Sequence, residues 1–262
     1  MENKKLTHEM VSEIWYKWFS DDAVNAEKII KSTFRILPQD PRCQLCSSPF
    51  EGVGGAIMRS FFKRTRSTLN PKFCNVCEHF AQIHQGGAEV EMSMLFVDVR
   101  GSTALSESMS AMEFQKLINR FFIGTSKIIT DEQGLVEKLA GDAVAAFWGA
   151  GFAGKDYAAR TIRVAQKIIE KMKAESIPVG VGVHTGVAYF GAMGEANGVV
   201  NISAIGEEVN TAARLASKAA EGEIVVSERA LEWAHMDGSM FESRTLELKG
   251  ISEPFPVRVM KG

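Results

Sequence analysis

The sequence predicts an α+β fold in which a ferredoxin-like sheet follows a small helical and metal-binding module. After residue 91 the apolar pattern reads strand, helix, strand, strand, helix, strand, which is the order of a ferredoxin-like sheet. Before that point a short helical stretch is followed by a segment that holds all four cysteines. We therefore expect a helical segment at residues 1–40, a four-cysteine module at 41–88 and a larger domain at 89–262.

Length, charge and hydropathy exclude several classes of protein. The chain has 262 residues, 45% of them hydrophobic, and a formal net charge of −2, values that are typical of a globular protein. The near-neutral charge argues against a protein that mainly coats nucleic acid or an anionic membrane. No apolar run approaches the roughly 20 residues that span a bilayer. The charged start MENKKLTHEM lacks the apolar region of an export signal, so we expect a cytoplasmic protein that does not enter a membrane.

Residues 7–34 are expected to be helical in two pieces. The second piece starts at SDDAVNAEKII, where a serine N-cap precedes acidic residues, and two prolines in LPQDPRC end it. We expect the aromatic face of the first piece to dock on the rest of the protein, and a dimerisation or partner helix is the alternative. The apolar residues at helical spacing on that face are Met10, Val11, Ile14, Trp15, Trp18 and Phe19.

The four cysteines form two C-x-x-C pairs, Cys43 with Cys46 and Cys74 with Cys77. In a reducing compartment such clustering indicates a metal site before disulfides. Four thiolates complete a tetrahedral Zn²⁺ site, although an iron–sulfur cluster needs the same ligands and unrelated thiols are a third alternative. Because four ligands leave no position for a substrate, we expect a structural zinc. A redox or metal sensor is the alternative role, since thiolates oxidise and release zinc.

The segment between the two cysteine pairs is basic, with Arg59, Lys63, Arg64 and Arg66 in MRSFFKRTRS. A zinc module with a basic loop can bind nucleic acid, but a solvated loop beside an acidic neighbour explains the charges equally well. No recognition helix is predicted here, so we do not expect a nucleic-acid partner. Since the segment has few periodic apolar residues, we expect the metal to staple it.

The domain after residue 91 is expected to alternate strands and helices with short connections. In chain order these are a strand at 92–98, a helix at 108–130, a hairpin at 134–149, a helix at 155–174, a strand at 178–191, a helix at 206–219, a strand at 222–227, a further helix and two closing strands. The hairpin turn is placed at Ala140 and Gly141.

Two aspartates are expected to meet at one rim of this sheet. Asp98 ends the apolar strand in LFVDVRGST, and Asp142 follows the glycine turn in EKLAGDAVAAF. The first and third strands of a ferredoxin-like sheet are neighbours, so these carboxylates would repel each other without a cation. Mg²⁺ favours such carboxylates together with substrate phosphates. Alternatively, Asp98 only caps a turn and Asp142 only suits a hairpin.

Five motifs favour the metal-binding interpretation. FVDVRGST, KLAGDA, GVHTG, IGEEVNTAARL and ELKG occur in this order and closely resemble the catalytic domain of class III adenylyl/guanylyl cyclases. The resemblance covers about residues 90–260 and leaves residues 1–88 outside. It implies a ferredoxin-like cyclase domain that carries out two-metal-ion catalysis on a nucleoside triphosphate.

The resemblance also implies a role for each matching residue. Asp98, Asp142 and the Val99 carbonyl match the ligands of two Mg²⁺ or Mn²⁺ ions. The other matches are Asn210 and Arg214, which position the ribose and stabilise the transition state, Lys249, which contacts the triphosphate, and Lys138 and Ser203, which read the base. Asn210 and Arg214 are four residues apart and therefore share a helix face.

The base-reading positions favour ATP. Lys138 can only donate a hydrogen bond, which suits N1 of adenine, whereas guanine presents a donor there. Glu137 is the neighbouring acceptor, but strand alternation directs it to the opposite face. Ser203 departs from the aspartate of many family members and can donate or accept. We therefore expect an adenylyl cyclase that forms 3′,5′-cyclic AMP and pyrophosphate for intracellular signalling, with a guanylyl or promiscuous cyclase as the alternative.

In the family the active site forms between two protomers. One supplies the aspartates and the other supplies the remaining residues, so the resemblance implies a head-to-tail homodimer with two equivalent sites. A catalytically silent, nucleotide-sensing homologue is a further alternative, disfavoured because both aspartates, Asn210 and Arg214 are present. His184 in VHTGV is a candidate general base. A histidine at a strand end is more commonly hydrogen-bonded to its neighbours without a catalytic role, so we expect that for His184.

Overall fold

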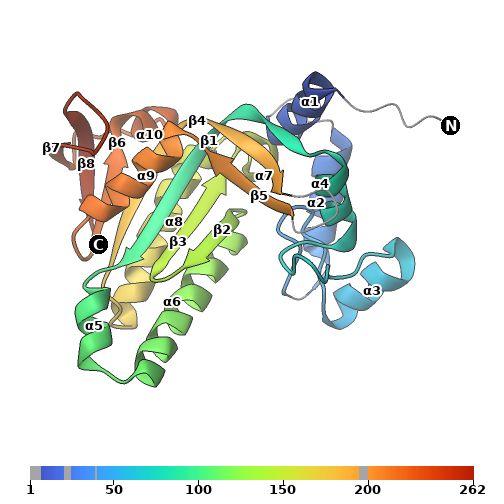
Figure 1. The fold of residues 1–262 in the computed structure, drawn as a ribbon, viewed down its shortest axis with the longest axis horizontal. Helices are drawn as coiled ribbons and strands as arrows, with labels where there is room; N and C mark the ends of the chain where they lie inside the picture. Colours follow the sequence, from blue (N-terminus) through green and yellow to red (C-terminus); the bar gives the residue numbers. More distant parts are fainter. Residues whose placement is uncertain (1–6, 21–24, 39, 195–199) are drawn as a thin grey trace. The chain divides into compact units, whose positions relative to one another are not determined.

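The computed structural model describes residues 7–20, 25–38, 40–194 and 200–262. The chain divides into two compact units. The first contains the described residues up to Val90 together with the described part of Tyr189–Ala204, and the second contains Glu91–Ala188 and Ile205–Gly262. Strand β1 (Gly86–Val99) therefore begins in the first unit and ends in the second, and strand β4 (Val179–Gly194) begins in the second and ends in the first (Figure 1).

The sheet confirms the predicted α+β fold. Within the described residues, eight strands pair in the order β2-β3-β1-β4-β6-β8-β7, with β5 paired to β4. Figure 1 shows β1 between β3 and β4, as expected for the first strand of a ferredoxin-like sheet. The strands are β1 Gly86–Val99, β2 Leu135–Ala140, β3 Ala143–Trp148, β4 Val179–Gly194, β5 Val200–Ile205, β6 Glu223–Ser227, β7 Glu242–Leu246 and β8 Phe255–Lys261.

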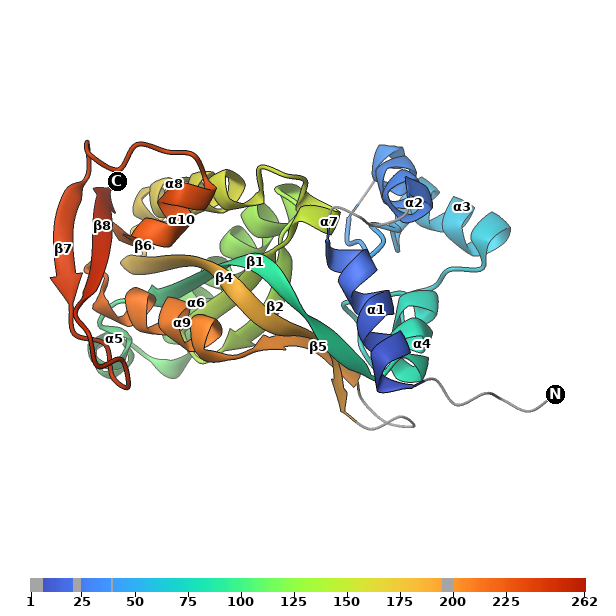
Figure 2. The same cartoon turned by 90° about the horizontal axis from the view of Figure 1, so that it is seen from above.

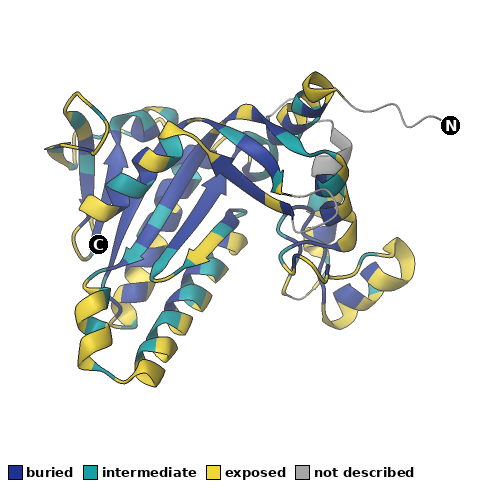
Figure 3. Cartoon of the chain, in the orientation of Figure 1, coloured by how far each residue is buried: buried dark blue, intermediate teal, exposed yellow. Residues whose placement is uncertain are grey.

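The helices of the second unit cover both faces of its sheet. Alternation along β6 shows this, because Ile224 and Val226 belong to the large core that includes α8, whereas Val225 packs with Leu215 of α9. Figure 2 accordingly shows α9 on the face opposite α8 and α10, and Figure 3 shows the buried strands between them. These helices are α5 Ser102–Ser108, α6 Ala111–Asp131, α7 Ala150–Ala153, α8 Tyr157–Ala174, α9 Glu207–Lys218 and α10 Glu228–Trp233.

The first unit is built on an aromatic cluster. Trp15 and Phe19 of α1 (His8–Phe19) are buried and contact Phe190 of β4, with ring centroids 6.1 and 3.9 Å away. Trp15 also packs edge-on against Phe80 of α4, at 5.5 Å. The predicted docking of the aromatic helix face is thus observed. The remaining helices of this unit are α2 Asn25–Ile36, α3 Gly52–Phe62 and α4 Asn75–Ile83.

Several features of the first unit differ from expectation. The segment around the cysteines forms helices α3 and α4, which the sparse apolar periodicity did not predict. The expected start of the larger domain, at residue 89, lies within strand β1, which begins at Gly86. Part of the predicted start of the second helix, at residues 21–24, lies outside the described residues. Among the residues that the structure does describe, no helix combines the length and apolar character needed to cross a membrane.

Candidate functional site

Asp98 and Asp142 meet at the end of β1, where the sequence placed them. β1 and β3 pair antiparallel with Asp98 opposite Ala143, and the Val99 amide donates to the Asp142 carbonyl at 3.0 Å. The preceding turn requires Gly141, whose φ of 62° is in the left-handed region that favours glycine. The end of β1 and the turn between β2 and β3 therefore bring the two carboxylates to one rim of the sheet.

The electrostatics of this rim suit a cation. Burial raises the pKa of Asp98, the neighbouring charge of Asp142 raises it further, and Arg100 opposes both effects. A divalent cation would relieve the carboxylate repulsion, and carboxylate oxygens are the ligands that Mg²⁺ and Mn²⁺ prefer. The residues present therefore fit a divalent metal held by Asp98 and Asp142.

Arg100 is a functional candidate that the sequence reasoning missed. Its guanidinium forms an ion pair with the Asp98 carboxylate. It also donates to the carbonyls of Ser217 and Ala219, each at 3.4 Å, at the C-terminal end of α9. Because a cation at a helix C-terminus complements the helix dipole, Arg100 connects the aspartate rim to α9.

Arg214 and Lys249 both line one pocket, which has a volume of about 560 Å³. Arg214 and Asn210 are one turn apart on α9, on the side left free by the buried residues Ala212 and Leu215. No hydrogen bond or ion pair joins this basic group to Asp98 or Asp142 in the described part of the chain. The other residues that line the pocket are Ser217, Lys218, Glu247, Leu248, Ile251, Ser252, Glu253 and Pro254.

The two predicted base-reading residues lie in different units. Lys138 is exposed on β2 and pairs with Ala145, whereas Ser203 is buried on β5 in the first unit. A β-bulge separates Val136 from Lys138 in the β2–β3 ladder, with Glu137 as the extra residue. Side chains do not alternate strictly across a bulge. Strand alternation therefore does not direct Glu137 to the face opposite Lys138.

His184 is a buried member of a polar chain and not an open catalytic base. Its Nδ1 lies 2.7 Å from Ser227 Oγ, and its Nε2 lies 2.5 Å from a Glu208 carboxylate oxygen. The other Glu208 oxygen accepts from Arg229 at 2.8 Å. The hydrogen bond from His184 is the main cause of the lowered pKa of Glu208. This series of hydrogen bonds anchors the first turn of α9, which also carries Asn210.

The four cysteine sulfurs form a compact buried cluster. Their Sγ atoms all lie within 4.8 Å of one another, and all four cysteines are free. The Cys74 amide donates to Cys43 Sγ at 3.3 Å, and the Cys77 amide donates to Cys74 Sγ at 3.5 Å. Hydrogen bonds from the other cysteines lower the pKa of the Cys74 thiol, whereas burial raises that of Cys43. Four sulfurs so arranged fit a metal ion better than four independent thiols.

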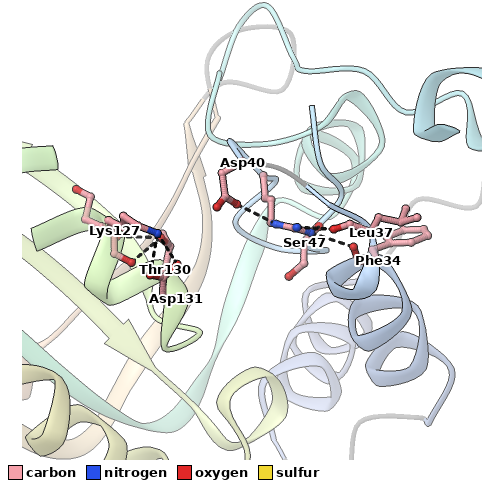
Figure 4. Close-up of polar contacts among 9 residues, drawn as sticks. Phe34, Leu37, Asp40, Ser47, Lys127, Thr130 and Asp131 are labelled. Atoms are coloured by element: carbon pink, nitrogen blue, oxygen red, sulfur yellow. Dashed lines mark hydrogen bonds and ion pairs between the residues drawn. The ribbon is translucent and has the colours of Figure 1, made fainter. Parts of the chain in front are cut away.

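Two arginines support this cluster. Arg64 Nη1 lies 3.3 Å from Cys46 Sγ and 3.4 Å from Cys74 Sγ. Arg42, next to Cys43, donates to the carbonyls of Phe34 at 3.0 Å and Ser47 at 3.3 Å, and so joins the end of α2 to the first cysteine turn. Figure 4 shows the contacts that Arg42 makes with Phe34, Leu37, Asp40 and Ser47.

Comparisons with known proteins agree with this geometry. The family described as the adenylate and guanylate cyclase catalytic domain matches residues 87–257. An adenylate cyclase of Anabaena cylindrica is 28% identical over 181 residues, which are 61% of this chain and 36% of that relative. The chain therefore spans about a third of the length of the curated relatives that it matches.

Solved structures show the same fold. The adenylyl cyclase CyaB of P. aeruginosa has a TM-score of 0.59 and 26% identity over 66% of this chain and 95% of that one. The guanylyl cyclase Cya2 has a TM-score of 0.58 and 25% identity over 67% of this chain and 93% of that one. Relatives with either base preference are thus similar to this chain.

Proposed function

Because the chain belongs to the adenylate and guanylate cyclase family of catalytic domains, we propose that it converts ATP to 3′,5′-cyclic AMP and pyrophosphate. The observation that carries the proposal is the pair of carboxylates, Asp98 and Asp142, at the ends of adjacent strands. Arg214 and Lys249 in one pocket support it, because a triphosphate needs cations beside the carboxylate-bound metal.

Asp98, Asp142 and the Val99 carbonyl are the proposed metal ligands. Mg²⁺ or Mn²⁺, two ions per active site, would supply Lewis-acid activation of the ribose 3′-oxygen and neutralise charge on the leaving pyrophosphate. The same carboxylates fix where the triphosphate lies. Their placement on a sheet rim holds the reacting atoms in a defined geometry, which is the main contribution a protein makes to phosphoryl chemistry.

Polar and basic residues of α9 and of the loop between β7 and β8 act on the nucleotide. Asn210 donates to the ribose and orients its 3′-oxygen for in-line attack on the α-phosphorus. Arg214 stabilises charge on the equatorial oxygens of the transition state, and a fixed guanidinium is more effective there than solvent. Lys249 holds the triphosphate. The Nζ of Lys138 donates to N1 of adenine, which is the basis for proposing ATP.

GTP is the second candidate substrate. Ser203 can donate or accept, so its hydroxyl also accommodates the O6 acceptor of guanine. The bulge at Glu137 brings an acceptor next to Lys138 without fixing it on the opposite face. A chain with both features discriminates less than one with an obligate acceptor at position 203.

We further propose that two chains form a head-to-tail homodimer. The aspartate pair has no hydrogen bond or ion pair to Asn210, Arg214 or Lys249 among the described residues. A second copy supplies the missing half of each site. The two halves then form two equivalent sites, as expected for an interface with two-fold symmetry.

The four-cysteine cluster is proposed to hold a structural Zn²⁺ through Cys43, Cys46, Cys74 and Cys77. All four are buried and near one another, which suits a closed tetrahedral site. An iron–sulfur cluster is the alternative and would give visible absorption. Metal analysis of the purified chain distinguishes them, since zinc without iron supports the proposal and iron with inorganic sulfide overturns it.

The test of the enzyme proposal is product formation from ATP or GTP with Mn²⁺. We expect cyclic AMP from the intact chain and at least about a thousandfold less from Asp98→Ala, because the metal and its electrostatic stabilisation are lost. Asp131→Ala is the control, since this exposed carboxylate on α6 forms an ion pair with Lys127, one turn away on the same helix. Cyclic GTP as the main product would reject the base assignment, and no product from either nucleotide would reject the activity.

A further inference from the structure

Strand β5 belongs to the same compact unit as the four-cysteine cluster. This unit contains the described residues up to Val90 and the described part of Tyr189–Ala204. β5 carries Ser203, the residue proposed to read the base, three positions after Val200. At about 3.3 Å per residue, Val200 and Ser203 are separated by roughly 10 Å along one extended strand. A contact that holds Val200 therefore acts on the same short strand as Ser203, together with the pairing of β5 and β4.

A polar route connects the cysteine turns to Val200. The Asn70 side chain donates from Nδ2 to the Val200 carbonyl at 3.3 Å and accepts from the Lys72 amide at 3.3 Å. The Lys72 carbonyl in turn accepts from the Gln44 amide at 3.0 Å, inside the first C-x-x-C pair. Asn70 is buried, and the Phe73 amide, directly before Cys74, donates to its carbonyl at 3.0 Å. The Asn70 turn thus touches both cysteine pairs and β5.

An aromatic route reaches the neighbouring strand. Helix α4 begins at the Cys74 N-cap and has Cys77 in its first turn. Phe80, one turn further, packs against Trp15, and Trp15 packs against Phe190 of β4. Figures 1 and 2 show α4 with α1 beside this part of β4. Because β4 pairs with β5, the helix that holds two of the cysteines also supports the strand beside Ser203.

We propose that metal bound by the four cysteines fixes β5 through Asn70 and thereby tunes nucleotide selection at Ser203. The nucleotide part rests on the proposed function, whereas the link from metal to β5 does not. Removing the metal leaves four buried sulfurs without a common partner, so the two cysteine turns separate. The Asn70 turn then moves with them, and the Val200 carbonyl loses the side-chain amide that holds it. The N-terminal module is thereby a regulator of the base-reading strand and not only a staple.

Hydrogen exchange of the full chain, followed by mass spectrometry, tests the link without requiring activity. We compare the zinc-loaded protein, the protein stripped by a zinc chelator, and the zinc-loaded variants Asn70→Ala and Asn75→Ala. Asn75 is the matched control: its side chain also makes two hydrogen bonds, with the Thr65 amide and the Lys63 carbonyl, but none to β5. The readout is exchange of residues 200–205.

The stripped protein and Asn70→Ala should exchange these amides about three- to tenfold faster than the loaded protein, the effect of losing one hydrogen bond. Asn75→Ala should match the loaded protein. Unchanged exchange after stripping would overturn the link, and this comparison stands even where Asn70→Ala fails to fold. In a parallel assay, Asn70→Ala but not Asn75→Ala should change the ATP-to-GTP ratio of kcat/KM. A chain that makes no cyclic nucleotide but keeps zinc-dependent exchange would reject the proposed function alone.

Discussion

Arg64 is a cationic residue in contact with the sulfurs of the four-cysteine cluster. Its guanidinium is within 3.4 Å of two sulfurs, so it offsets part of the negative charge of four thiolates around one divalent ion. We expect Arg64→Gln to weaken zinc binding about 10- to 100-fold, the usual cost of losing a partner of a metal ligand. Competition against a chromophoric chelator measures this affinity.

Lys63→Gln is the control for Arg64→Gln. It removes the same charge one residue earlier, from an exposed side chain that has no hydrogen bond to a sulfur in the described structure. Its zinc affinity should equal that of the unaltered chain. Equal affinity of all three proteins would show that Arg64 does not stabilise the centre.

Glu208 gives a pH-dependent prediction. His184 lowers the pKa of this carboxyl mainly by hydrogen bonding, and Arg229 adds a second contact. The folded-state pKa is below the unfolded value of about 4.3, so the stabilisation is fully present above that value and is lost as the pH falls through the lower one. Glu208→Gln should lower the free energy of unfolding by about 1–3 kcal/mol at pH 7.

Urea denaturation across pH checks the sign of this effect. The difference between the unaltered chain and Glu208→Gln should shrink as the pH falls below about 4. Glu207→Gln, a change of the exposed neighbour in the same helical turn, should cost less than about 0.5 kcal/mol. A Glu208→Gln deficit that stays constant down to pH 3 would contradict the assignment.

Local residue patterns predicted the candidate metal ligands but not the arginines that contact them. The C-x-x-C spacing and the strand-end aspartates made Cys43 and Asp98 candidate ligands because each belongs to a local motif. Arg64 and Arg100 were not assigned, since their contacts join residues far apart in sequence, such as Arg100 with Ser217. Only the folded chain brings such pairs together.

Gly182 sets the distance between β4 and α9. A Cβ at this position would lie 2.2 Å from the Ala216 amide nitrogen and 2.6 Å from the Ala212 carbonyl oxygen. Both atoms are backbone, so the helix itself must move. Gly182→Ala should cost about 1–3 kcal/mol of stability. It should also lower turnover about 100-fold, because α9 carries Asn210 and Arg214 and catalysis tolerates little displacement.

Gly124→Ala separates this effect from a general intolerance of glycine replacement. A Cβ at Gly124, within α6, would come closest to the terminal methyl of Met172, at 2.9 Å, and would have two side-chain carbons of Lys171 at 3.9 Å. All of these atoms belong to flexible side chains and none to the backbone. Alanine is favoured over glycine in a helix by about 1 kcal/mol, so this variant should be neutral or slightly stabilised. Thermal denaturation and turnover are measured for both. A Gly182→Ala protein with unaltered turnover would show that α9 does not depend on this close approach.

Elements with strong periodicity were predictable, and elements held by distant contacts were not. Helices α6 and α8 and the β2–β3 hairpin follow their apolar patterns, and α6 has a capping box between Ser110 and Glu113. Helices α3 and α4 have only 11 and 9 residues, and the Cys74 side chain caps the start of α4. Strand β5 is held by its pairing with β4. The sequence of a short strand does not reveal which strand it pairs with, so β5 could not be predicted from its own residues.

At the scale of the whole molecule, the residues of the proposed active site fall into two groups. The aspartates lie at the rim formed by β1 and β3, and Arg214 with Lys249 lines a separate pocket. Sequence similarity identified both halves but not their distance, because residue order does not reveal which copy supplies each side chain. The dimer proposal, which the family resemblance implies, is testable without a structure of the complex.

Two inactive variants should restore activity when they are mixed. Asp98→Ala destroys one half-site and Arg214→Ala the other, so each homodimer has no intact site. A mixed dimer retains one intact site, formed by the unaltered aspartates of one chain and the unaltered arginine of the other. Random exchange of equal amounts makes half of the dimers mixed, so activity should return to about a quarter of that of the unaltered protein. Mixtures that stay inactive after subunits have demonstrably exchanged, or an active chain that light scattering shows to be a monomer, would place both halves of the site in a single chain.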